Sequence, residues 1–84
     1  MHIVSLRLLR GTTVIDYRQL RRAVYRAAGP GDGLEHVYVQ DDFEGADVVL
    51  FVCAANGRRA AALAERIVHR SLADDELLGW QVAA

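Results

Sequence analysis

The chain begins with an alternation of apolar and polar side chains over residues 2–10, HIVSLRLLR. Val4, Leu6 and Leu8 occupy every second position. Successive side chains of a strand point to opposite faces of a sheet, so this spacing predicts a strand with one buried face. We expect these three side chains to lie on the inner face and the polar residues between them on the outer one.

A helical pattern follows over about residues 16–28. Asp16 stands three residues before Gln19, a pair typical of the capping box that begins a helix. Leu20 and Val24 then recur at the spacing of one helix face. The GPGDG segment, residues 29–33, consists almost entirely of residues that favour turns, and we expect it to end the helix.

The rest of the chain predicts three more strands and a second helix. LEHVYVQ, residues 34–40, alternates, whereas DVVLFVCA, residues 47–54, is apolar without alternation; both patterns are typical of strands. The acidic segment DDFEGA between them predicts a hairpin loop. Asn56 is a candidate cap for a helix over residues 57–72, and WQVA, residues 80–83, predicts a short last strand.

The predicted order of elements is βαββαβ, and it resembles the ferredoxin-like fold at the level of architecture. The resemblance rests on element order across residues 1–84. It implies a single α+β domain, a ferredoxin-like βαββαβ sandwich in which two helices cover one face of a four-stranded antiparallel sheet. The first and third strands would be central. An analogy of fold carries no activity with it, so no function follows from it.

The third predicted strand lacks alternation, which predicts an open sheet face that another surface covers. Val49 and Phe51 would point away from the helices, and monomeric proteins rarely expose large apolar patches. Arg7 and Tyr38 would share that face. A second copy of the chain is the simplest cover, so we expect a homodimer that uses these four residues. The alternative, a monomer in which Arg7 and Tyr38 shade Phe51, stays open.

The composition is that of one small domain with its own core. Apolar residues make up 52% of the 84 residues, enough for a core without disulfides or metal. A single cysteine cannot form an internal bridge, which favours a reducing compartment. No apolar run approaches the length of a membrane span, and the first residues lack the pattern of a signal peptide. We expect a cytoplasmic protein without membrane contact, cofactor or metal.

The charges are segregated along the chain. Residues 1–28 sum to +5 and residues 29–50 to −6, although the total is −1. Arg18, Arg22 and Arg26 recur every fourth residue on the outer face of the first predicted helix. Such a row is either solvated or contacts an acidic protein partner. The near-neutral total and the absence of lysine disfavour nucleic acid as the partner.

The start of the second predicted helix is another candidate anion or partner contact. It contains Asn56, Gly57, Arg58 and Arg59. Positive side chains in a first turn oppose the helix dipole by about 0.3–1 kcal/mol each, so a bound anion would relieve a local cost. Alternatively, both arginines extend into water or pair with the acidic residues of the predicted hairpin loop.

The stretch VVLFVCAANGRRA, residues 48–60, resembles the phosphate loop of low-molecular-weight protein tyrosine phosphatases, in which an arginine follows a cysteine by six positions. By that resemblance, which covers residues 49–59, Cys53 would be the nucleophile, Asn56 would brace the loop and Arg59 would bind phosphate.

This sequence departs from that family at several points. Ala60 replaces the hydroxyl residue after the arginine, and Ala55 replaces a glycine of the loop. No acidic residue is a convincing general acid, and the loop would follow the third strand of an antiparallel sheet. We therefore interpret the match as coincidental, assign no catalytic residue, and predict that Cys53 is a small buried apolar residue.

These patterns favour a small accessory or regulatory protein-interaction module, homodimeric and more consistent with binding than with catalysis. Its contact surface would be the open sheet face or the arginine-rich helical layer. One alternative is a small-molecule-binding or cyclase-like ferredoxin-fold protein that holds an apolar ligand between sheet and helices. A third hypothesis, a thiol phosphatase-like enzyme that uses Cys53, has the least support.

Overall fold

The computed structural model describes residues 1–83 and follows the predicted order of elements. The elements are β1 (His2–Leu9), α1 (Tyr17–Ala27), β2 (Leu34–Asp41), β3 (Gly45–Val52), α2 (Gly57–Ser71), the short 3-10 helix η1 (Asp75–Leu77) and β4 (Gln81–Val82). The expected helices and strands are confirmed to within a few residues at their ends. The 3-10 helix is an additional element between α2 and β4.

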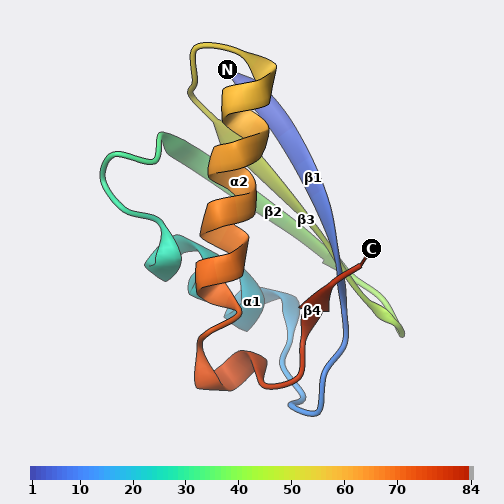
Figure 1. Ribbon diagram of the computed structural model, residues 1–84. Helices are drawn as coiled ribbons and strands as arrows, with labels where there is room; N and C mark the ends of the chain where they lie inside the picture. Colours follow the sequence, from blue (N-terminus) through green and yellow to red (C-terminus); the bar gives the residue numbers. More distant parts are fainter. Residues whose placement is uncertain (84) are drawn as a thin grey trace.

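The four strands form one antiparallel sheet in the order β2-β3-β1-β4. Both helices lie on one face of this sheet, and the other face is left open (Figure 1). The α+β class and the central position of β1 and β3 are therefore confirmed. At this coarse level the arrangement is compatible with the ferredoxin-like fold.

Strand register fixes which side chains face the helices. In the pairing of β1 with β3, Val4 is opposite Leu50 and Leu8 is opposite Ala46. Leu8, Leu50 and Ala46 are fully buried, and Val4 packs against the same core. The expected alternation of β1 is therefore confirmed, and the apolar strand β3 divides into a buried row and an outward row.

Local side-chain signals begin both helices where the sequence predicts. The Asp16 carboxylate accepts a hydrogen bond from the Gln19 N–H at 2.9 Å, and the Gln19 side chain accepts one from the Asp16 N–H at 2.9 Å. The Asn56 side chain accepts from the Arg59 N–H at 2.8 Å. These bonds satisfy main-chain donors that the first turn of a helix otherwise leaves free.

The core fills the space between the helices and the sheet. Leu20 and Val24 of α1, together with Ile67 of α2, are fully buried against the inward row of the sheet. Each such side chain contributes about 1.5–3 kcal/mol through removal of apolar surface from water. The segment after α2 closes one end of this core with Leu77 and Trp80, which are also buried.

An ion pair that the sequence pattern did not indicate ties the turn after α1 to α2. Asp32 lies in that turn, is only 7% exposed, and accepts a hydrogen bond from the Gly29 N–H at 2.8 Å. Its carboxylate also pairs with Arg70 near the end of α2. The Gly29 N–H and then the Arg70 guanidinium hold the pKa of Asp32 below its ordinary value. The turn is thus a fixed connection between the two helices.

Candidate functional site

The open sheet face presents three parallel rows of outward side chains. Register places Ile3 opposite Phe51, and Phe51 opposite His36 on the other side of β3. The next row joins Ser5, Val49 and Tyr38, and the third joins Arg7, Asp47 and Gln40. The four predicted dimer-face residues therefore lie on one surface, as alternation along the strands requires.

The end of this face that contains the first residues of β1 is largely apolar. We call Ile3, Tyr38, Val49 and Phe51 the apolar patch. Ile3 is 65% exposed and Tyr38 is 52% exposed, whereas Val49 and Phe51 are partly buried. The rings of His36 and Phe51 meet edge to face, with centroids 5.5 Å apart. The patch therefore combines a shielded centre with exposed apolar flanks.

The other end of the face carries an ion-pair cluster. The Arg7 guanidinium donates to both carboxylate oxygens of Asp42 at 2.8 Å and lies 3.4 Å from Asp47. The hydrogen bonds from Arg7 hold the pKa of Asp42 at about 2, below its ordinary 3.8. Arg7 is therefore committed to the β2–β3 hairpin and does not cover Phe51, which lies two rows away.

The prediction that Cys53 is buried is wrong. Its side chain is exposed, one residue beyond the end of β3. The Cys53 N–H donates to the Gly33 carbonyl at 2.8 Å. This hydrogen bond holds the main chain at Cys53, while the side chain is exposed. An exposed thiol alone does not make a catalytic centre. The loop still differs from the phosphatase loop at the points named above, with Ala60 in place of a hydroxyl residue and Ala55 in place of a glycine.

The first turn of α2 places Arg58 and Arg59 in solvent. Both side chains are exposed, and Gly57 is the first residue of the helix. Among residues 1–83 neither arginine pairs with an acidic side chain. The suggested partner Asp42 is engaged by Arg7 at the opposite end of β3.

The three arginines of the predicted row on α1 differ in whether they have an acidic partner. Arg26 pairs with Asp74 at 2.7 Å and lies 3.8 Å from Glu76. These contacts, the Asp74 hydrogen bond first, raise the pKa of Arg26. Arg18 and Arg22 have no acidic partner in the part of the chain that the structure describes. The row and the start of α2 are on different helices and do not form one site.

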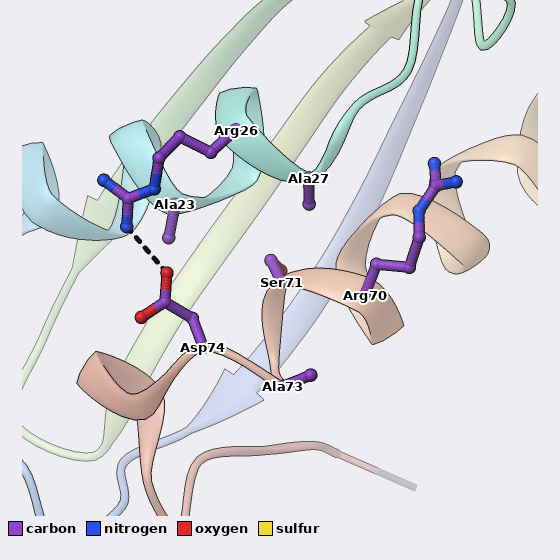
Figure 2. Close-up of a pocket in the computed structure, with 7 residues that line it drawn as sticks. All are labelled: Ala23, Arg26, Ala27, Arg70, Ser71, Ala73 and Asp74. Atoms are coloured by element: carbon purple, nitrogen blue, oxygen red, sulfur yellow. Dashed lines mark hydrogen bonds and ion pairs between the residues drawn. The ribbon is translucent and has the colours of Figure 1, made fainter.

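A surface pocket of about 300 Å³ lies where the C-terminal ends of the two helices meet. Its floor is made of small side chains, with Ala23 and Ala27 on α1 and Ser71 on α2. Figure 2 shows Arg26 reaching across from α1 to Asp74, whereas Arg70 points away from that pair. Both arginines already have acidic partners, since Arg70 is bound to Asp32. We therefore interpret this pocket as a structural junction.

Other classes of site find no support in the described residues. No group of three histidine, cysteine, aspartate or glutamate side chains within residues 1–83 could hold a metal ion. None of the helices in that range has the length and apolar character needed to cross a membrane. Comparisons with protein-family models, with curated proteins and with solved structures found no match to this chain.

Proposed function

We propose that the chain is a small cytoplasmic accessory or regulatory module that acts by binding, and that its open sheet face is the surface through which two copies associate. The observation that carries the proposal is the apolar patch, in which Ile3 and Tyr38 are 65% and 52% exposed on a regular sheet. A second copy would remove this apolar surface from water without requiring the fold to change.

The geometry of the face suits a two-fold contact. In such a contact the same patch serves both partners, so each patch lies over its own counterpart or over the neighbouring ion-pair cluster. The cluster of Arg7, Asp42 and Asp47 carries one positive and two negative charges, a net charge of −1. A contact in which each patch covers its own counterpart leaves this cluster at the rim, where it keeps its contact with water.

The size of the face limits the affinity. Three strands of eight residues each give a face of about 26 by 14 Å, with a rise of about 3.3 Å per residue and about 4.8 Å between strands. This footprint, about 360 Å² per copy, is below the roughly 800 Å² per partner of standard specific interfaces, so we expect weak association with a dissociation constant in the micromolar range or above.

Substitution of Phe51 by aspartate tests the proposal. In sedimentation velocity from about 1 to about 200 μM, the wild-type protein should shift from monomer to dimer, and Phe51→Asp should remain a monomer. Phe43→Asp is the matched control, because Phe43 is 96% exposed at the hairpin tip, outside the three rows. That control should dimerise as the wild type does.

A second variant keeps the test decisive if Phe51→Asp unfolds. Ile3→Asp charges the patch at a residue that is 65% exposed, so it should prevent dimerisation while circular dichroism stays unchanged. A wild-type protein that is monomeric throughout the range would contradict self-association. Equal dimerisation of the wild type and both patch variants would place the contact elsewhere.

The filled core favours this proposal over a ligand held between sheet and helices. Leu20, Leu50 and Ile67 are fully buried in that layer. The pocket at the C-terminal ends of the two helices is lined only by residues of the helices and of the segment that follows α2. The packing therefore offers no specific observation in support of an interior ligand.

A further inference from the structure

One face of α1 forms a pocket whose walls are basic. Arg18, Arg21, Arg22 and Tyr25 line a pocket of about 270 Å³. Their spacing of three, four and seven residues places all four side chains on one side of a helix. The structure thereby groups Arg21 with Arg18 and Arg22, whereas Arg26, the last residue of the row in the sequence, is engaged by Asp74.

The positive charge of this pocket is not balanced. Within the described chain, no carboxylate pairs with Arg18, Arg21 or Arg22. Helix α1 contains no acidic residue. Asp16, just before the helix, keeps its negative charge while it accepts the Gln19 N–H, and it attracts Arg18, so it offsets at most one of the three positive charges.

The wall made by Tyr25 is held in place from the sheet. Its hydroxyl accepts a hydrogen bond from the Val37 N–H of β2 at 2.9 Å and lies 3.3 Å from Nδ1 of His36. Arg18 is held as well, because its Nε donates to the Tyr17 hydroxyl at 3.2 Å. Two of the four lining side chains are thus positioned before any ligand arrives, which lowers the entropy cost of binding.

We propose that this pocket binds a phosphate group carrying two negative charges. Guanidinium groups bind phosphate oxygens in pairs through parallel N–H donors. Three such groups on adjacent turns can surround one dianion, which would also relieve their mutual repulsion. A volume of about 270 Å³ is just below the range of about 300–1,000 Å³ typical of sites for drug-sized ligands. A compact anion therefore fits better than a large apolar molecule.

The phosphate can come from a small phosphorylated compound or from a phosphorylated side chain of another protein. The site is on a helix, whereas the proposed dimer face is on the opposite side of the sheet (Figure 1). Phosphate can therefore reach the pocket in both the monomer and the dimer. Ile3→Asp should bind phosphate as well as the wild type does, and it is preferred here to Phe51→Asp because the His36 ring contacts both Phe51 and the Tyr25 hydroxyl.

The test is a titration with inorganic pyrophosphate, followed by NMR of the protein labelled with ¹⁵N, including the arginine side chains. We expect saturable shifts of Arg18, Arg21 and Arg22. The double variant Arg21→Gln/Arg22→Gln should weaken binding at least tenfold. The control Arg58→Gln/Arg59→Gln removes the same charge from another exposed arginine pair without an acidic partner, and it should change binding less than twofold.

Two peptide arms identify the source of the phosphate. A phosphoserine peptide that binds more tightly than pyrophosphate, with an unphosphorylated copy that does not bind, would assign a protein ligand. Equal binding of pyrophosphate and the phosphopeptide would assign a small phosphate compound. Equal losses in the two double variants, or the absence of saturation with either probe, would overturn the proposal. So would a nucleic acid oligomer that binds more tightly than both probes and is weakened by Arg21→Gln/Arg22→Gln, because the same arginines would then serve another class of ligand.

Discussion

The exposure of side chains changes from one position to the next at the end of β3. Val52 is buried, whereas Cys53 is exposed, because alternation continues past the last paired residue. The sequence pattern predicts that Cys53 is buried at the end of an apolar strand. That prediction fails because β3 ends at Val52 and Cys53 lies beyond it, in an exposed position.

Exposure of Cys53 leads to a prediction about its reactivity. The thiol of the native monomer should react with iodoacetamide at a rate close to that of the unfolded chain. Cys53→Ser should change the free energy of unfolding by no more than about 0.5 kcal/mol, as for other surface substitutions. Mass spectrometry of the alkylated protein and urea unfolding measure the two quantities. A thiol protected until the protein unfolds would contradict the exposed position.

At the level of elements, local signals were predictable and tertiary ones were not. Asp16 with Gln19 and Asn56 begin the helices where the sequence indicates, because capping acts within one helical turn. The pairing of Asp32 with Arg70 joins residues 38 positions apart, so no local spacing indicates it. The same limit applies to the ion-pair cluster and to the grouping of arginines around Tyr25, which depend on how the elements pack.

The β2–β3 hairpin should be sensitive to acid through Asp42. Its pKa is about 2 in the folded protein, below the ordinary 3.8, because Arg7 donates hydrogen bonds to the charged form. A lowered pKa contributes stability that is complete above about pH 4 and is lost as the pH falls through about 2. Urea unfolding between those limits should therefore show a steep loss of stability.

Removal of the Asp42 charge tests whether Asp42 causes this sensitivity to acid. Asp42→Asn should be less stable than the wild type at neutral pH, and its stability should fall less on acidification. Some of the fall remains, because the pKa values of Asp32 and Asp74 are also lowered. Arg7→Gln removes the main donor to the Asp42 carboxylate and should reduce the acid dependence in the same direction. The full wild-type acid dependence in Arg7→Gln would contradict the role of Arg7.

For the whole molecule, the order of elements was enough to predict the layers. One sheet and two amphipathic helices can bury their apolar faces together only if both helices cover the same side. The order of elements does not determine what contacts the open face, because any partner lies outside this chain. Strand register shows only which residues lie on that face.

The shared core makes the stability of this chain sensitive to single truncations. A chain of 84 residues has a total stability of about 4–13 kcal/mol at typical values per residue. Leu50 is fully buried at the centre of the sheet, and Leu50→Ala should cost about 2–5 kcal/mol. Leu78→Ala is the matched control, since Leu78 is 64% exposed, and should cost little. Urea unfolding of both variants measures the difference, and similar costs would contradict the packing described.

The pairing of β1 with β3 has a consequence for synthesis of the protein. The paired residues run from Leu9 with Gly45 to His2 with Val52, so the first strand is made long before its partner. At about 5–20 residues per second, a gap of about 40 residues keeps β1 unpaired for about 2–8 s on the ribosome. The helix that packs against β1 is α2, which is also made later. Both rows of β1, including the outward row with Ile3, are therefore free to meet chaperones or other chains during that time.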